Sequence, residues 1–290
     1  MQHHLFKGTL YMLGAMFSFV SVNAIFKTLE FSYHPLQVVF FRYFFALIPC
    51  LIVLWARQEG ASLKISDFKP HILRGAIGVV GLLMLFQSLS LLPLAEAVTI
   101  SFASSFFITI FSWILLKEKV SLMACLAILI GFAGVIIAAK PDSIHLKLGV
   151  LCGLLSAIAE GFILTHSRLI SATNSSSAIA FYYALFAAIF AAIGLPVVWT
   201  TPSTYDLIVL IVLGIGGGIG QYLLITATRL APGQTLAPLI YSQIVWSILY
   251  DIILFDAIPS KSLYTGCGLI IAAGLVMILK DKIIQIKQTN

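Results

Sequence analysis

Ten long apolar runs are the feature that most limits what this chain of 290 residues can fold into. A membrane-spanning helix needs about 20 mostly apolar residues to cross a hydrocarbon layer of about 30 Å. Of all residues, 60% are hydrophobic and 10% are charged, whereas a soluble domain carries about 25% charged residues. The sequence therefore predicts an all-α integral membrane protein with ten transmembrane helices, near residues 7–26, 35–55, 71–92, 94–116, 121–139, 147–168, 177–199, 205–229, 233–255 and 260–280.

Lysine and arginine are unequally divided between the two ends of these helices. With the N-terminus in the cytoplasm, 12 of the 17 basic residues lie on the inner side and 4 on the outer side, and Arg42 lies inside a span. Cytoplasmic loops carry the excess of positive charge in membrane proteins. We therefore predict a multi-pass protein of the bacterial inner membrane with both termini in the cytoplasm, and we interpret the net charge of +6 as a topology signal and not as a nucleic-acid footprint.

Catalytic and metal-binding motifs are missing from the sequence. The four cysteines lie far apart in apolar segments, which favours buried thiols over disulfides or metal ligands. No P-loop, HExxH or GxSxG motif is present. We expect no catalytic residues, no metal and no cofactor, and we expect that the chain is not an enzyme.

An internal repeat divides the chain into residues 1–140 and 141–290. At an offset of 139 residues the register is kept by three glycines and a proline, Gly75, Gly78, Gly81 and Pro93, which match Gly214, Gly217, Gly220 and Pro232. Each half holds five spans, and an odd number means that the second half enters the membrane from the opposite side. The sequence thus predicts a 5+5 inverted repeat, the architecture of many secondary transporters, with the substrate near the midplane between the halves.

Polar residues form stripes on two of the predicted helices. In the run 94–116, hydroxyls recur at helical spacing at Ser101, Ser105, Thr109 and Ser112. In the run 233–255 the stripe consists of Gln243, Ser247, Tyr250 and Asp251. The repeat matches Ser104 with Gln243 and Phe102 with Tyr241. We predict that the stripes form opposite walls of a polar central cavity; the alternative is that the hydroxyls bond to carbonyls of their own helix.

Ionisable residues inside spans are stronger evidence, because each costs at least about 2.5 kcal/mol at mid-depth. Arg42 either pairs with Asp251 as a gate or structural bridge, binds a substrate carboxylate or phosphate, or extends outwards to water. Glu160 either titrates during transport, binds a cationic substrate group, or is a protonated structural acid. Glu96 is interpreted as a favourable charge at a helix N-terminus.

The predicted substrate-binding set joins these residues with polar and aromatic side chains near the middle of their spans. It consists of Arg42, Gln87, Ser101, Ser104, Ser105, Glu160, Gln221, Tyr222, Tyr241, Gln243 and Asp251.

Two stretches resemble a known family. The stretch LPLAEAVTISFASSFFITIFSWILLKEKVS resembles the fourth-helix region of the EamA branch of the drug/metabolite transporter superfamily, and GFAGVIIAAKP resembles the fifth helix of that family. In the second half, FDAIPS departs from the expected glutamate-containing loop. The resemblance implies a ten-helix inverted-repeat exporter or importer of small metabolites.

Three shorter motifs, FFRYFF, HILRG and TPSTYDL, look like those of S-adenosylmethionine uptake permeases, although permeases of other specificity share them. The resulting hypothesis is a secondary transporter that moves a small polar or zwitterionic metabolite by alternating access. An organic-anion or nucleotide-like substrate is the alternative, and a membrane enzyme or a channel is less favoured. The expected partners are the metabolite and the lipid bilayer, with monomer or homodimer left open.

Overall fold

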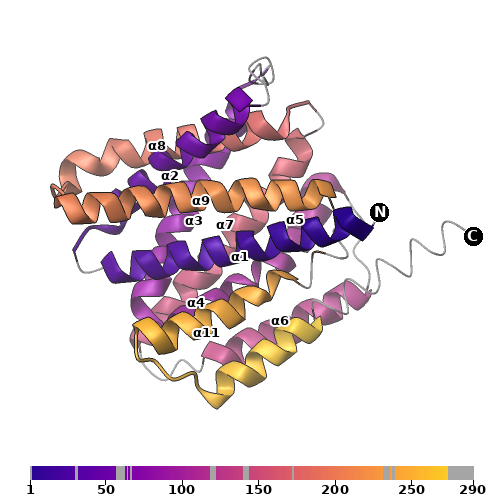
Figure 1. The fold of residues 1–290 in the computed structure, drawn as a ribbon. Helices are drawn as coiled ribbons and strands as arrows, with labels where there is room; N and C mark the ends of the chain where they lie inside the picture. The colour runs from indigo at the N-terminus through magenta and orange to yellow at the C-terminus, as the bar shows by residue number, and fades with distance from the viewer. Residues whose placement is uncertain are drawn as a thin grey trace, which may run out of the picture.

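The computed structural model is a bundle of membrane-length helices (Figure 1). It describes residues 2–29, 32–56, 63, 65, 67–117, 122–139, 144–171, 173–230, 236 and 239–273. The helices are α1 Gln2–Leu29, α2 Pro35–Ala56, α3 Lys69–Leu91, α4 Leu94–Ser101, α5 Ser104–Leu116, α6 Leu122–Ala139, α7 Ile144–Ile170, α8 Ser176–Val198, α9 Thr204–Leu230 and α11 Ser242–Leu254. A further helix covers residues 261–273.

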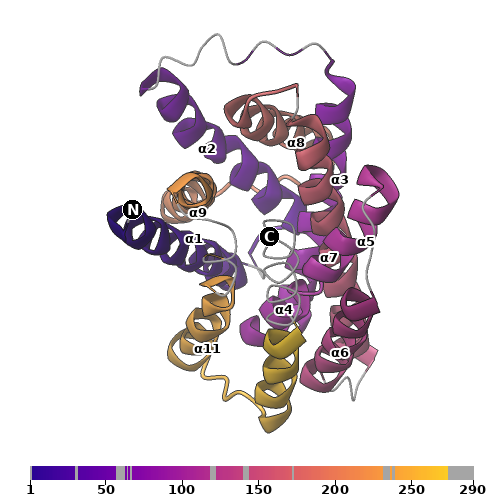
Figure 2. The same cartoon turned by 90° about the vertical axis from the view of Figure 1, so that its right-hand side faces the viewer.

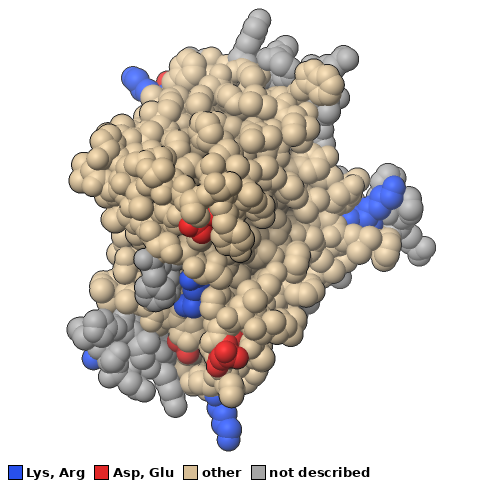
Figure 3. Space-filling model, turned by 60° about the vertical axis from the view of Figure 1, so that its left-hand side comes forward, with Lys and Arg blue, Asp and Glu red and all other residues tan. Residues whose placement is uncertain are grey.

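Seven helical segments within the described residues are long and apolar enough to cross a membrane, and shorter apolar helices accompany them. One of the seven, Leu94–Leu116, joins α4 and α5 into a single span. With α6, α11 and the helix at 261–273, the order and number of spans agree with the sequence, so the predicted fold class is confirmed. Figure 3 shows a face that is mostly uncharged, with charged side chains isolated on it, as expected of a surface that faces lipid.

The helix contacts repeat when the two halves exchange roles. The most extensive contacts are α1 with α9 and α3 with α7, and exchanging the halves converts the first pair into the second. Helix α2 packs against both α8 and α9, while α8 packs against both α2 and α3. Figure 2 shows α2 and α8 together at one side of the bundle and α4 and α11 at the other. This arrangement is what a duplicated five-helix unit predicts.

The repeated glycines bring helix backbones close together. A Cβ atom added at Gly75 would lie 2.6 Å from the Phe186 Cβ atom of α8, and one added at Gly214 would lie 2.5 Å from the Phe45 Cβ atom of α2. Both distances are far below van der Waals contact, so a larger residue would push the helices apart. The repeat therefore conserves close helix packing between equivalent pairs of helices, as small residues do in membrane bundles.

The fourth span is not the single regular helix that the apolar run suggested. Between α4 and α5, the Phe102 amide bonds to the Thr99 carbonyl and the Ala103 amide to the Ile100 carbonyl, which is the three-residue spacing of a 3₁₀ turn. The hydroxyls of Ser101 and Ser105 donate to the backbone carbonyls of Val98 and Phe102. Side chains that bond to nearby carbonyls compete with regular helix geometry, and a 3₁₀ stretch inside a helix often marks a hinge.

The second half has an equivalent interruption. Residues 239–240 are helical, Tyr241 is a turn, and α11 begins at Ser242. The Phe102 and Tyr241 rings, which the repeat matches, contact each other with centroids 5.3 Å apart. The two interruptions thus meet between the halves.

At the end of the bundle opposite the N-terminus, hydrogen bonds tie the start of α2 to the connection between α8 and α9. Gln37 bonds to both backbone groups of Thr200, at 2.6 and 2.9 Å. Outside the spans, the Tyr33 hydroxyl donates to the Asp206 carboxylate at 2.6 Å. That hydrogen bond raises the pKa of Tyr33, so the hydroxyl stays protonated and remains a donor.

Candidate functional site

Arg42 reaches from α2 onto the surface of α9. Its side chain is half-buried, and a Cβ atom added at Gly217 would lie 1.8 Å from the guanidinium carbon. Only glycine leaves space for the guanidinium there. The neighbouring groups that interact electrostatically with the guanidinium are Tyr43, Tyr183 and Cys50. The guanidinium therefore lies at a contact between a helix of the first half and a helix of the second half.

Two tyrosines that the repeat matches bond to each other beside Arg42. The hydroxyls of Tyr43 and Tyr183 lie 2.9 Å apart, and their rings meet edge to face with centroids at 5.5 Å. The Tyr43 hydroxyl also donates to the Gly78 carbonyl at 3.2 Å, so Tyr183 is the donor within the pair. The two residues are 140 positions apart, close to the repeat length, so equivalent parts of the two halves meet at this contact between α2 and α8.

Arg74 lies against the same tyrosine from α3. It is only 4% exposed, it donates through Nη1 to the Ile179 carbonyl at 3.2 Å, and its guanidinium carbon lies 5.0 Å from the Tyr183 ring centre. Sequence reasoning missed this residue because it counted Arg74 with the basic residues of the inner side, at the start of the predicted span 71–92. Its place next to the matched Gly75 and Gly78 was the available signal.

Glu160 of α7 is an acidic residue of the predicted substrate-binding set. Its side chain is exposed in this structure. Ser104, at the first position of α5, is close enough for a side-chain hydrogen bond to it. Glu160 and both arginines act on Tyr183. Tyr183 is thus within electrostatic reach of ionisable side chains from α2, α3 and α7.

Most of the remaining predicted residues make contacts within the helix bundle. Gln243 contacts the Met16 sulfur through its amide nitrogen at 3.0 Å, and Tyr241 contacts Phe102. The hydroxyls of Ser101, Ser105 and Thr109 donate to backbone carbonyls of their own span, so the alternative of backbone bonding holds for these three. Gln87 is half-buried in α3.

Asp251 caps a helix of the other half. It is 1% exposed, and its two oxygens accept hydrogen bonds from the Leu94 and Ala95 amides at 2.9 and 2.7 Å. Pro93, the residue before α4, offers no capping side chain, and the first amides of a helix need an acceptor. The cation that acts on Asp251 is Lys27 and not Arg42, so the alternative of an Arg42–Asp251 gate is wrong for this conformation.

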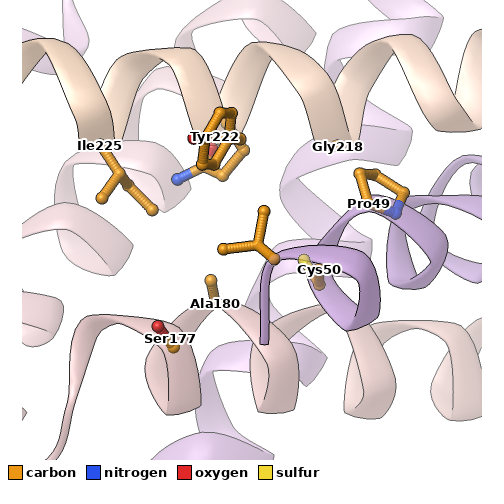
Figure 4. Close-up of a pocket in the computed structure, with 9 residues that line it drawn as sticks. Pro49, Cys50, Ser177, Ala180, Gly218, Tyr222 and Ile225 are labelled. Atoms are coloured by element: carbon orange, nitrogen blue, oxygen red, sulfur yellow. The ribbon is translucent and has the colours of Figure 1, made fainter. Parts of the chain in front are cut away.

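A separate pocket lies between α2, α8 and α9 (Figure 4). The cavity volume is about 40 Å³, and the pocket opens to the outside. Two of the predicted residues, Gln221 and Tyr222, line it. The other lining residues are Pro49, Cys50, Val53, Ser177, Ala180, Gly218 and Ile225.

The sequence pattern of the EamA-like transporter family matches the chain twice, over residues 6–139 and 147–279. The chain belongs to the EamA-like transporter family. This EamA protein is therefore a transporter and an integral multi-pass membrane protein, and its two matched segments agree with the duplicated helix contacts.

Named relatives of this EamA protein have different cargoes. It is 29% identical to the "S-adenosylmethionine uptake transporter" of Rickettsia bellii, with 88% of each chain covered. It is 27% identical to the "Pseudopaline exporter CntI" of Pseudomonas aeruginosa, covering 93% of this chain and 95% of the relative. A protein of known crystal structure, 19% identical, matches its fold with a TM-score of 0.69 over 94% of this chain and 96% of the other.

Proposed function

We propose that this EamA protein is a secondary transporter of a small zwitterionic metabolite, an amino acid or an amino-acid derivative such as S-adenosylmethionine. It moves the metabolite across the bacterial inner membrane by alternating access, with both termini in the cytoplasm. The two repeats, residues 1–140 and 141–290, act as the units that rock against each other.

One observation carries this proposal: Arg42 of α2 and Glu160 of α7 are ionisable residues inside spans, and both lie within electrostatic reach of Tyr183, whose hydroxyl lies 2.9 Å from that of Tyr43 where α2 meets α8. A zwitterion presents a carboxylate and an ammonium or sulfonium group, and these match a guanidinium and a carboxylate placed on different helices. Intramembrane charges that face a cavity mark substrate pathways in membrane proteins. Relatives named for uptake of S-adenosylmethionine support the same class of substrate.

An organic anion such as a nucleotide is the second candidate. The observation in its favour is the excess of positive charge: Arg74 lies against the Tyr183 ring and Arg42 is within its electrostatic reach, whereas Glu160 is the one acid among the described residues that influences it. Arginine is well suited to phosphate as well as to carboxylate.

The test is counterflow in proteoliposomes loaded with one of two unlabelled solutes, S-adenosylmethionine or AMP. We expect labelled S-adenosylmethionine to accumulate against its own unlabelled pool, and accumulation to fail in both Arg42→Gln and Glu160→Gln. Exchange of AMP that needs Arg42 but not Glu160 would favour the anion candidate. Uptake by both variants at the wild-type rate would remove this site from the transport mechanism.

A further inference from the structure

Two histidines outside the proposed transport site lie at the end of the bundle where α3 begins and α7 ends. His71 is the third residue of α3 and is 0% exposed, and His166 lies four residues before the last residue of α7 and is 8% exposed. Arg74, one turn after His71, is also buried. Asn174, in the connection that follows α7, donates to the Ile170 carbonyl at 3.1 Å. We call His71, Arg74, His166 and Asn174 the histidine cluster.

The register of α3 against α7 brings the members of the histidine cluster together. These helices make one of the most extensive contacts of the molecule, and residue numbers rise along one helix as they fall along the other. The close pairs that fix the register, with an added Cβ atom at most 3.0 Å from its neighbour, are Gly149 with Leu91, Gly153 with Ser88 and Gly81 with Ala159. Seven residues beyond the last pair, which is about two helical turns, Arg74 lies opposite His166. His71 lies one further turn along α3, beside the end of α7.

Helix α8 packs against the same part of α3 (Figure 2). The Tyr182 ring contacts the His71 ring with centroids 5.4 Å apart, and the Ile179 carbonyl accepts the hydrogen bond from Arg74. On α7, the His166 ring stacks on Phe162 with centroids 5.3 Å apart and planes 12° apart. The contacts that close over the histidine cluster are therefore aromatic rings and a backbone carbonyl.

Hydrogen-bond partners are missing from this cluster more than elsewhere. In the part of the chain that the structure describes, eight buried side-chain nitrogen or oxygen atoms have no hydrogen-bond partner, and five of them belong to the histidine cluster. They are both ring nitrogens of His71, Nε of Arg74, Nδ1 of His166 and Oδ1 of Asn174. Buried polar groups in proteins nearly always have a partner, so a concentration of unpartnered atoms requires an explanation.

The charges around the cluster decide how it responds to a proton. Arg74 is within electrostatic reach of both imidazoles, and the acid that reaches His71 is Asp67, an exposed residue before α3. The other charged or titratable groups on the elements packed around the cluster are Lys69 on α3, Glu160 and Arg168 on α7, Tyr182 and Tyr183 on α8, and Arg42, Tyr43 and Cys50 on α2, and α5 carries none. Protonation of His71 or His166 therefore adds a positive charge near Arg74, where the unpartnered ring nitrogens find no acceptor.

Water removes this conflict. An imidazolium is stable where water reaches its N–H groups, and water reaches this cluster only if α3, α7 and α8 separate at this end. An uncharged imidazole has a weaker requirement for water. Lower pH therefore favours the separated arrangement and higher pH favours the packed arrangement, because the separated arrangement binds more protons.

We propose that the histidine cluster is a pH-sensitive contact, which keeps this end of the bundle closed while both imidazoles are uncharged and lets it open when they are protonated. Imidazoles in water change charge between about pH 5 and 8, so the contact responds within the physiological range. In the orientation predicted from the charge distribution, the opening faces the cytoplasm. The inference goes beyond the proposed function, since it holds whichever metabolite is carried.

Hydrogen exchange of the purified full chain, without added substrate, tests this contact. The exchange rates of peptides that cover residues 68–78 and 162–174 are divided by the intrinsic rates at each pH, because intrinsic exchange itself depends on pH. From about pH 8 to about pH 5.5, we expect protection in these peptides to fall by at least about tenfold, since each proton taken up on opening changes the equilibrium by up to about tenfold per pH unit. Residues 84–91, towards the other end of α3, are expected to keep their protection.

Replacing both imidazoles by uncharged side chains is expected to abolish the pH dependence. The variant combines His71→Gln with His166→Gln, and the matched control is His34→Gln, the same change at an exposed histidine before α2. The control is expected to lose protection at low pH as the wild type does. Should the double variant fail to fold, the two single variants take its place, and each is expected to show a smaller pH dependence because one imidazole remains.

Three outcomes would overturn the pH-sensitive contact. The first is wild-type protection at 68–78 and 162–174 that does not change with pH. The second is an equal loss at 84–91, which would indicate general unfolding in acid. The third is a double variant, or a pair of single variants, that responds to pH as the wild type does. Because no substrate is present, none of these results bears on the proposed function, and a failure of counterflow leaves the contact untouched.

Discussion

At the scale of single residues, the site is organised around one hydroxyl. The Tyr183 hydroxyl donates to Tyr43, and its ring lies under Arg74. The charges of Arg42 and Glu160 both reach it. Because hydrogen bonds and charges reinforce each other where water is scarce, a change in any one of these side chains alters the field felt by a substrate at the others.

Glu160→Gln keeps the shape of the side chain and removes its charge. If Glu160 binds the ammonium or sulfonium group, transport is expected to fall several-fold or more, since a hydrogen bond to a charged group contributes about 1.5–3 kcal/mol. The measurement is proteoliposome uptake at equal protein, from about pH 5 to 8 to detect a role in proton coupling as well.

The matched control for this change is Glu96→Gln, the same substitution at the start of α4. We expect the control to transport nearly as well as the wild type. Wild-type rates of Glu160→Gln at every pH would show that Glu160 is a structural acid and would leave Arg42 as the charged residue to pursue.

At the scale of helices, the most informative contact is the cap that Asp251 of α11 provides for α4. Capping normally comes from the residue just before a helix, but here the acceptor comes from a residue more than 150 positions later in the chain. The bond couples the N-terminal end of α4 to the position of α11, and Lys27 of α1 joins the same region through its bonds to the Leu89 and Leu92 carbonyls. A movement of α11 relative to α4 must break this cap.

Asp251→Ala is therefore expected to destabilise the protein by about 1–2 kcal/mol, the usual cost of losing a cap. It is also expected to speed amide exchange at Leu94 and Ala95. The measurements are the melting temperature of the purified protein and hydrogen exchange of the peptide that contains these residues. The control is Asp256→Ala, an exposed aspartate five residues further on; a similar effect of both substitutions on exchange at α4 would contradict the cap.

Cross-linking tests whether the two interrupted spans move against each other. Ser104 begins α5 and Gln243 is the second residue of α11, and each lies directly after the interruption of its span. Cysteines at both positions, joined by a short bifunctional reagent, are expected to trap one conformation and stop counterflow until the link is cleaved. The single-cysteine proteins, treated in the same way, should keep transporting. Unimpaired transport after verified cross-linking would argue against movement at this point.

At the scale of the whole molecule, the unequal distribution of lysine and arginine remains the basis of the predicted orientation. Reporters that are active only outside the cytoplasm are expected to stay silent when fused to either end of the chain. A reporter in the connection just before Lys261 is expected to be active and serves as the positive control. Activity at one terminus would reverse the assignment of the inner and outer sides.

The sequence predicted the helices well because length and apolarity alone decide which segments cross a lipid layer. It predicted Arg42 and Glu160 for a similar reason, since a charge inside an apolar run is visible without a structure. It could not predict the interruption at Phe102 and Ala103, because neither residue type breaks helices and the cause lies in hydroxyl bonds to the backbone.

Long-range partners were also beyond the sequence. Nothing in the residues around Asp251 indicates that its carboxylate oxygens accept hydrogen bonds from the Leu94 and Ala95 amides. Arg74 was counted with the charges at the inner membrane surface although it lies within the predicted span 71–92, and the structure buries it in α3. The surroundings of Asp251 and Arg74 depend on contacts between helices that are distant in the sequence. A local sequence pattern does not predict such contacts.

The contact between Tyr43 and Tyr183, residues that the repeat relates to each other, has a consequence for the balance between transport states. If the two halves are equivalent, exchanging their conformations converts the inward-open state into the outward-open state at nearly the same backbone energy. The energies of the two states then differ because of positions at which the halves carry different residues, and charges are among them: at offsets of 140, 139 and 141 residues, Arg42 corresponds to Tyr182, Arg74 to Leu213 and Glu160 to Phe19. Since about 1.4 kcal/mol shifts a ratio tenfold, we expect such unmatched charges to bias the resting conformation of the empty protein, and a substrate that neutralises them to reduce that bias.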